Sequence, residues 1–146
     1  MAGYGVFAQV YDKLTLNVPY DQIAEYYDAK IRKFRDGDGN FLADAGCGTG
    51  NLTARLARLG YDVIGAEPSP DMLSEAMNKP HDGVQYICQD MTELDLYGEA
   101  DIIVSTLDSV NHLSSAADIT KFFRAAALNL RRGGLLLFDF NTIYKH

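Results

Sequence analysis

The feature that most constrains this chain is a run of glycines between a short apolar segment and a helical pattern. Residues 41–43 are apolar, and Gly46, Gly48 and Gly50 follow at alternate positions. Residues 51–59 then carry leucines at helical spacing. Glycine allows a sharp bend and removes the Cβ atoms that would hold a ligand away from the peptide N–H groups. The run therefore predicts a strand, a tight ligand-binding loop and a helix.

The spacing of the glycines separates two ligand classes, dinucleotides and S-adenosylmethionine. The dinucleotide fingerprint G-x-G-x-x-G needs a third glycine, and counting from Gly46 and Gly48 places Asn51 there. The chain has an acid, Asp44, two residues before the first glycine of the run. That carboxylate would repel a pyrophosphate but attract the ammonium group of S-adenosylmethionine, which carries no phosphate. The loop favours S-adenosylmethionine, and a nicotinamide-dependent oxidoreductase is the weaker hypothesis.

Strand and helix patterns alternate along residues 41–140. Further strands are expected over residues 61–66, 84–89, 100–107 and 135–140, and residues 119–130 form a helix that residues 131–134 end with two arginines and two glycines. By the right-handed crossover rule this alternation predicts a doubly wound parallel sheet, with ligands at the carboxyl ends of the strands. Four acids lie at such ends: Asp44, Glu67, Asp90 and Asp108.

These motifs together resemble the class I S-adenosylmethionine-dependent methyltransferases over almost the whole chain. The resemblance implies an α/β fold, a Rossmann-like doubly wound parallel sheet of about five strands with helices on both faces and an N-terminal helical lid. It also implies in-line transfer of the methyl group of S-adenosyl-L-methionine to a nitrogen, oxygen or carbon of a small-molecule substrate. The product would be S-adenosyl-L-homocysteine.

The resemblance also implies roles for residues in the cofactor site. Glu67 would receive both ribose hydroxyls, because two carboxylate oxygens match two vicinal hydroxyls. Asp90 would accept a hydrogen bond from the adenine amino group, and the backbone N–H of Met91 would cap a ring nitrogen. Met72 would pack on the adenosine. The expected cofactor-binding residues are Asp44, Gly46, Cys47, Gly48, Gly50, Glu67, Pro68, Met72, Asp90, Met91, Leu107, Tyr11 and Tyr20.

The N-terminal part of the chain reads as two helical stretches that are separated around residues 17–19. Residues 1–36 resemble the lid of a subset of these methyltransferases, which closes over the methionine end of the cofactor. Tyr11 and Tyr20 are the expected contacts, although aromatic residues at helical spacing are equally typical of a core. Residues 37–146 would form the cofactor-binding core.

The loop after the fourth strand carries the candidate catalytic residues. In related enzymes this loop lies beside the sulfonium and the incoming substrate, which implies a contact from Leu107. An amine acceptor needs little chemical help, whereas a hydroxyl acceptor needs a general base. Asp108 and His112 are the candidates there. No metal site is expected, because the acidic turn at residues 36–40 lacks the downstream bidentate acid of a calcium loop.

Composition limits the partners that can be expected. Lys and Arg number 13 against 20 Asp and Glu, which gives a formal charge of −7 without any basic run. Nucleic-acid binding is therefore not expected, although a tRNA or nucleoside methyltransferase stays an alternative if a further segment carries positive charge. No apolar stretch is long enough to span a bilayer. Cys47 and Cys88 are typical of reduced thiols in a cytoplasmic protein.

The chain stops at His146, soon after the fifth strand. The resemblance implies a further helix and an antiparallel strand pair beyond that strand, together with substrate-binding elements. We therefore expect either a truncated chain or a homodimer that covers the exposed edge of the fifth strand. A cofactor-binding fragment without turnover is accordingly a second functional hypothesis.

Overall fold

The sheet has the predicted parallel, doubly wound topology. The computed structural model describes residues 18–80, 83–106 and 115–139. Within these residues, five parallel strands form one sheet in the order β3-β2-β1-β4-β5. The order reverses between β1 and β4, which creates the switch point where such sheets bind ligands. The strands are β1 (Phe41–Ala45), β2 (Asp62–Ala66), β3 (Gln85–Ile87), β4 (Ala100–Ser105) and β5 (Leu130–Phe138).

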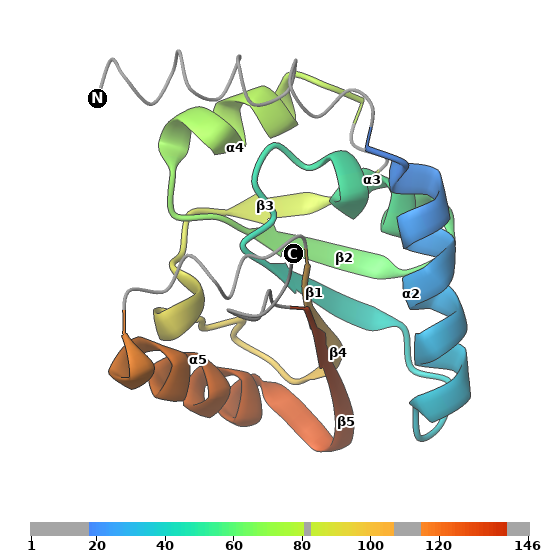
Figure 1. Ribbon diagram of the computed structural model, residues 1–146, viewed down its shortest axis with the longest axis vertical. Coiled ribbons are helices and arrows are strands. Elements are labelled where there is room, and N and C mark those ends of the chain that lie inside the picture. The colour runs from blue at the N-terminus through green and yellow to red at the C-terminus, as the bar shows by residue number, and fades with distance from the viewer. Residues whose placement is uncertain (1–17, 81–82, 107–114, 140–146) are drawn as a thin grey trace, which may run out of the picture.

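Helices cover both faces of this sheet. On one face lie α2 (Tyr20–Phe34) and α3 (Asn51–Arg58), and on the other lies α5 (Ala116–Asn129), as Figure 1 shows. Side chains alternate across each strand, so Leu42 of β1 packs toward α2 and α3 while Ala43 packs toward α5. The remaining helices are α4 (Pro70–Met77) and the short 3-10 helix η1 (Met91–Glu93). Among the described residues no helix is both long and apolar enough to cross a bilayer.

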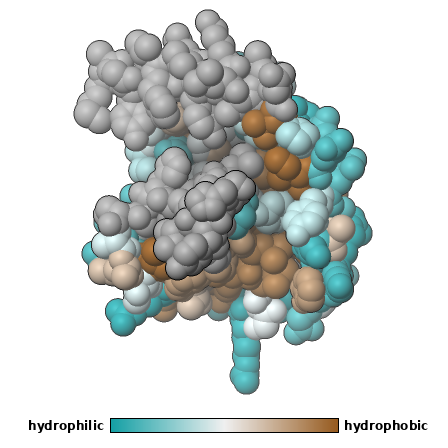
Figure 2. Space-filling view, in the orientation of Figure 1, coloured by the Kyte–Doolittle hydropathy of each residue, from teal (hydrophilic) through white to brown (hydrophobic). Residues whose placement is uncertain are grey.

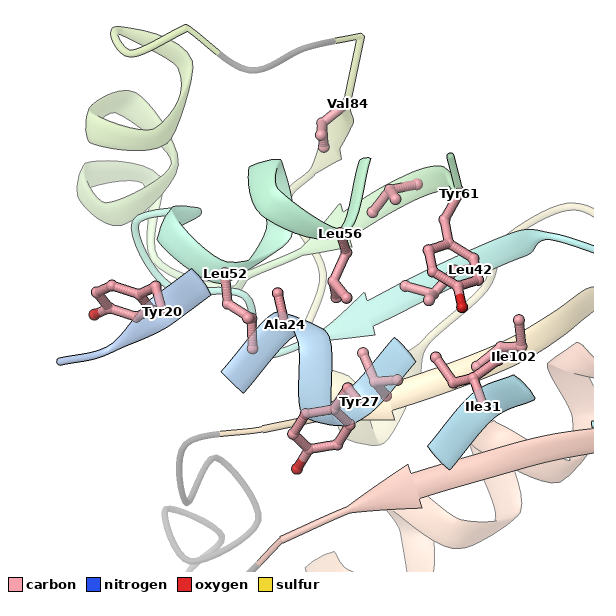
Figure 3. Close-up of a cluster of buried hydrophobic side chains, with 12 residues drawn as sticks. Tyr20, Ala24, Tyr27, Ile31, Leu42, Leu52, Leu56, Tyr61, Val84 and Ile102 are labelled. Carbon is pink, nitrogen blue, oxygen red and sulfur yellow. The ribbon is translucent and has the colours of Figure 1, made fainter. Parts of the chain in front are cut away.

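Helix α2 is part of the core of the sheet. Its buried residues recur at helical spacing, and they pack with residues of α3 and of β1, β2 and β4, as Figure 3 shows. Ile31 is fully buried in this cluster. The segment 1–36 was expected to be a lid, but α2 shares the core of the cofactor-binding part of the chain. Residues 1–17 lie outside the described residues, so a lid formed by them stays a prediction.

The junction of α5 and β5 differs from the sequence-based expectation. Residues 131–134 were expected to end the helix, but α5 ends at Asn129 and β5 begins at Leu130. Arg131 is held by the neighbouring strand, because its Nε donates to Asp101 Oδ1 at 2.7 Å. Because β5 pairs with β4, the two arginines and two glycines at residues 131–134 belong to the strand and not to a turn after the helix.

The edge strand β5 carries part of the exposed hydrophobic surface. In the view of Figure 2, hydrophobic residues gather over α5 and β5. The rings of Phe123 and Phe138 are in contact with their centroids 5.2 Å apart, and each residue is 36% exposed. Strand β5 is the last in the sheet order, with β4 beside it. The homodimer expected through this edge stays a prediction.

Asn129 is the last residue of α5, and it supports the chain segment that follows η1. This residue is only 7% exposed. Its Nδ2 donates to the carbonyl of Leu94 at 2.7 Å and to that of Ala125 at 2.8 Å, and its Oδ1 accepts from Leu96 N at 2.8 Å. One buried amide thereby satisfies backbone groups of a segment that has no strand partner.

We predict that Asn129→Ala destabilises the chain by about 2–4 kcal/mol, because it leaves the buried Leu94 carbonyl and Leu96 N–H without their partner. Urea unfolding followed by circular dichroism measures this change. Asn78→Ala, at an exposed position after α4, is the matched control and should change stability far less. Equal losses in the two variants would contradict a structural role for the Asn129 amide.

Candidate functional site

The loop between β1 and α3 depends on the conformational freedom of glycine. Gly46, Gly48 and Gly50 have φ angles of +77°, +58° and +81°, which side-chain-bearing residues rarely adopt. A Cβ added to Gly50 would collide with the hydroxyl of Tyr86, whereas one added to Gly48 would meet no atom within 4 Å. Gly50 is therefore needed for packing against β3, and Gly48 borders open space.

The N–H groups of this loop are largely used to hold the loop against β2. Gly46 N and Cys47 N donate to the carbonyl of Ala66 at 2.8 and 3.0 Å, and Gly48 N donates to Glu67 Oε1 at 2.9 Å. A phosphate-binding loop instead directs such groups toward its ligand. The sequence analysis expected the glycines to expose N–H groups, but these three donors already have acceptors. The loop therefore suits a ligand without a phosphate.

Asp44 is a buried carboxylate at the end of β1. The residue is 1% exposed, and its Oδ2 accepts a hydrogen bond from Thr53 Oγ1 of α3 at 2.8 Å. Its Oδ1 is buried and has no hydrogen-bond partner among the described residues. A buried carboxylate oxygen needs a donor, so this atom points to a missing hydrogen-bond donor, from a ligand or a water molecule. Sequence analysis missed Thr53, whose only signal is a polar residue on the buried face of α3.

Burial raises the pKa of Asp44 to about 7. The hydrogen bond from Thr53 opposes this rise, and the negative charges of Glu67 and Asp139 add to it. Asp44 therefore changes charge near neutral pH. A cationic ligand beside it would favour the ionised form.

Glu67 joins the glycine loop to the start of α4. Its Oε1 accepts from Gly48 N, and its Oε2 accepts from Ser69 N at 3.0 Å. Ser69 in turn caps α4, since its Oγ accepts from Met72 N at 3.2 Å. Each carboxylate oxygen can accept more than one hydrogen bond, so Glu67 can hold the loop and still receive ligand hydroxyl groups.

Two residues that sequence analysis did not assign to the site, Tyr27 and Asp139, meet at the same edge of the sheet. The hydroxyl of Tyr27 on α2 donates to Asp139 Oδ2, just after β5, at 2.8 Å. Burial and this hydrogen bond raise the pKa of Tyr27 above its usual value, so its phenol stays neutral. Asp139 lies at the carboxyl end of a strand, as Asp44 and Glu67 do, and that position is the signal that could have identified it. The edge thus gathers three acids and favours a cation.

Cys47 lies in the loop as a protonated thiol. It is half-buried, and burial raises the pKa of the thiol well above its usual value, with a further rise from the charges of Asp44 and Glu67. A thiolate nucleophile is therefore disfavoured at this position. Its predicted contact with a cofactor is one of packing.

The residues expected near an adenosine lie along the loops after β2 and β3. Asp90 is exposed and caps η1, because its Oδ1 accepts from Thr92 N at 2.9 Å. Strand β3 is shorter than expected and ends at Ile87, which places Asp90 in the loop beyond it. The side chains of Met72 and Met91 are buried in the core, and Pro68 is exposed beside Glu67. Their roles as cofactor contacts stay predictions.

The remaining predicted residues are placed elsewhere or not described. Tyr20 is 7% exposed and packs between α2 and α3, with the Arg55 guanidinium 5.3 Å from the centre of its ring. That placement is typical of a core aromatic. Four further residues lie outside the described residues, and their roles stay predictions: Tyr11, Leu107, Asp108 and His112.

Comparison with known proteins defines the class of this chain. Residues 42–134 match the family described as "Methyltransferase domain". The match spans more than half of the chain and includes β1 from Leu42 onward, the glycine loop, and the acids Asp44 and Glu67. The chain belongs to this family of methyltransferase domains, and the family inferred from the motifs is confirmed.

Individual relatives agree with the family match. The chain is 35% identical over 145 residues to a Bacillus subtilis (strain 168) protein named "Putative methyltransferase YqeM", covering 97% of this chain and 57% of the relative. A crystal structure of an S-adenosylmethionine-dependent methyltransferase from Clostridium acetobutylicum ATCC 824 is 34% identical, with a TM-score of 0.78 over 97% of this chain and 58% of that chain.

A third similar structure is that of SAM-bound CalS10, an amino pentose methyltransferase from Micromonospora echinaspora. It is 28% identical to the chain with a TM-score of 0.81, over 95% of this chain and 57% of CalS10. The chain thus spans a little more than half the length of the proteins that it matches. Its fold agrees with theirs over nearly all of its own length.

We predict that Asp44→Asn removes a pH dependence of stability. The folded-state pKa of Asp44 lies above the usual value of 3.8, so its contribution to stability is complete below about pH 4 and is lost as the pH rises through about 7. Between pH 5 and pH 8 the parent chain should therefore lose stability relative to Asp44→Asn, by about 2–3 kcal/mol. Urea unfolding at both pH values measures the difference.

The control for this prediction is Asp38→Asn, which removes the same charge from an exposed turn. That variant should keep the pH dependence of the parent chain. Identical pH slopes for the parent chain and Asp44→Asn would rule out the buried carboxyl group as their source.

Proposed function

We propose that this chain binds S-adenosylmethionine at the carboxyl edge of the sheet and that the longer protein to which such a domain belongs transfers its methyl group to a small molecule. The observation that carries the proposal is Asp44 Oδ1, which is buried and has no hydrogen-bond partner among the described residues, beside a glycine loop in which the N–H groups of Gly46, Cys47 and Gly48 already have acceptors. That combination suits a ligand with an ammonium group and no phosphate.

The charge of the site supports the same ligand class. Asp44, Glu67 and Asp139 all lie at the carboxyl ends of strands at this edge, and the charges of Glu67 and Asp139 both raise the pKa of Asp44. S-adenosylmethionine carries an ammonium and a sulfonium, and both would be attracted by these acids. A dinucleotide would bring two negative phosphates to the same place, which disfavours a nicotinamide-dependent enzyme.

The residues present fit the cofactor group by group. We infer that Asp44 binds the ammonium group of the cofactor, either directly or through water. Each oxygen of Glu67 accepts one hydrogen bond, from Gly48 or from Ser69, and we infer that its remaining lone pairs accept hydrogen bonds from the ribose hydroxyls. Asp90 and Met91 would contact the adenine. When bound, the cofactor supplies an already activated methyl group, so the main task of the chain is to bind and orient it. Orientation alone can supply about 7–11 kcal/mol of a reaction barrier.

The acceptor is proposed to be a small molecule with a nitrogen or oxygen nucleophile. CalS10 is named as an amino pentose methyltransferase, and a Nitrobacter winogradskyi protein that is 31% identical over 126 residues is named as a ubiquinone biosynthesis O-methyltransferase. Each name describes that relative and not this chain. For an oxygen acceptor, Asp108 and His112 are our proposed general bases, whereas an amine would need none.

A second candidate function is cofactor binding without turnover by the 146-residue chain. It is favoured by the length comparison, because the chain spans 57–59% of its first two curated relatives. The comparison of methyl transfer by this chain and by a full-length homologue, over a panel of amine and hydroxyl acceptors, separates the two. Turnover by the short chain would exclude the second candidate.

We predict that S-adenosylhomocysteine binds to the chain and that Glu67→Ala weakens this binding at least tenfold, because two charged hydrogen bonds to the ribose are lost. Isothermal titration calorimetry measures both affinities. Glu25→Ala, on the exposed face of α2, removes the same charge and should bind as the parent chain does.

The same titration has an outcome that would exclude the proposal. Tighter binding of NAD than of S-adenosylhomocysteine by a folded, monodisperse sample would assign the site to dinucleotides. Unchanged binding in Glu67→Ala would show that the ligand lies elsewhere.

We predict that the affinity for S-adenosylhomocysteine rises about five- to tenfold between pH 6 and pH 7.5. The ionised form of Asp44, which attracts the ligand ammonium, becomes populated as the pH rises through about 7. Asp44→Asn should bind more weakly at pH 7.5 and show no such rise. Calorimetry at constant ionic strength tests this, and a parallel rise in both proteins would assign the pH dependence to another group.

A further inference from the structure

A pocket lies between α3 and α4, beside the glycine loop. It has a volume of about 160 Å³ and is floored by Tyr86 of β3. Ligand pockets for drug-sized molecules are about 300–1,000 Å³, so this pocket suits a group of a few atoms. Asp44, Glu67 and Asp90 do not line it, although Gly50 of the glycine loop does.

The lining of this pocket is cationic, although the chain is acidic. Arg55, Arg58 and Lys79 line it, and none of its lining residues is an aspartate or glutamate. The whole chain has 13 Lys and Arg against 20 Asp and Glu. Three cations around one small concavity therefore run against the overall charge and point to an anionic ligand.

Neutral oxygen atoms hold two of these cations in place. Lys79 Nζ donates to the carbonyl of Thr49 at 3.0 Å and to Asn51 Oδ1 at 3.2 Å, and Arg55 donates through an η nitrogen to the carbonyl of Asn51 at 2.7 Å. The two cationic groups thus converge on one residue at the start of α3. Their mutual repulsion is a cost that a bound anion would relieve.

The carboxylate of Asp21 reaches Arg55 from outside the pocket. Asp21 of α2 accepts from Arg55 Nε at 2.8 Å, and its side chain is 81% exposed. An ion pair so exposed contributes little energy, and the guanidinium has further N–H groups to offer. Arg55 can therefore serve an anion in the pocket while it keeps this pair.

We propose that the α3–α4 pocket binds a phosphate group, as inorganic phosphate or as part of a small phosphomonoester. A tetrahedral dianion offers oxygen acceptors to two guanidinium groups and one ammonium group at once. The Tyr86 hydroxyl lies at the floor of the pocket beside Gly50. The pocket shares Gly50 with the expected cofactor contacts, but the phosphate proposal rests on its three cations and does not depend on cofactor binding.

The test is a titration of inorganic phosphate into the ¹⁵N-labelled chain at constant ionic strength, followed by amide chemical shifts. We expect saturable shifts confined to residues 49–58 and the end of α4. Arg58→Gln and Lys79→Gln should each weaken the affinity about five- to tenfold, as expected for one lost charged hydrogen bond, and the double variant should abolish saturation. Lys121→Gln, the same change on an exposed position of α5, should leave the affinity unchanged.

Arg58→Gln keeps the test interpretable if Lys79→Gln disturbs the glycine loop, because Arg58 is exposed. Glycerol 3-phosphate binding at least tenfold tighter than inorganic phosphate would support a phosphomonoester ligand, and equal affinities would support the free anion. Shifts that sodium chloride reproduces, or that persist in the double variant, would overturn the proposal. S-adenosylhomocysteine added to the same samples reports separately on the cofactor site, so failure of either proposal is recognised by itself.

Discussion

The burial of the Asp44 carboxylate at the end of β1 is the constraint on which the site depends. Removing a carboxylate from water is costly unless it is hydrogen-bonded. Thr53 of α3 donates to one of its oxygens, and the other has no partner in the part of the chain that the structure describes. The cost arises because β1 lies in the middle of the sheet, beneath α2 and α3, and this position buries the Asp44 side chain. A positively charged ligand beside this carboxyl group would favour its ionised form, and our functional proposal rests on that effect.

The glycine loop is held to the end of β2 by three of its N–H groups. Ala66 accepts two of its N–H groups, and Glu67 accepts a third while also binding Ser69 at the start of α4. A ligand that contacts Glu67 therefore acts on the loop and on α4 together. Ordering of the loop and recognition of hydroxyl groups then depend on the same carboxylate.

The same loop separates two regions of opposite charge. Acids gather on the carboxyl edge of the sheet, whereas Arg55, Arg58 and Lys79 line the pocket between α3 and α4. Lys79 touches the loop itself through the carbonyl of Thr49. Two chemically different ligands can thus be recognised within a few residues of one another, because the loop offers a different surface to each side.

The sequence by itself determined the doubly wound parallel sheet, the glycine loop and the acids at the ends of β1 and β2, because these depend on local spacing and on the handedness of crossovers. It did not predict that α2 belongs to the core, that β5 begins at Leu130, or that Thr53, Tyr27 and Asp139 join the site. Those features arise from contacts between residues far apart in the chain, such as Tyr27 with Asp139 and Arg131 with Asp101. Only the tertiary structure decided them, because burial and charge at a residue depend on neighbours that its local sequence does not specify.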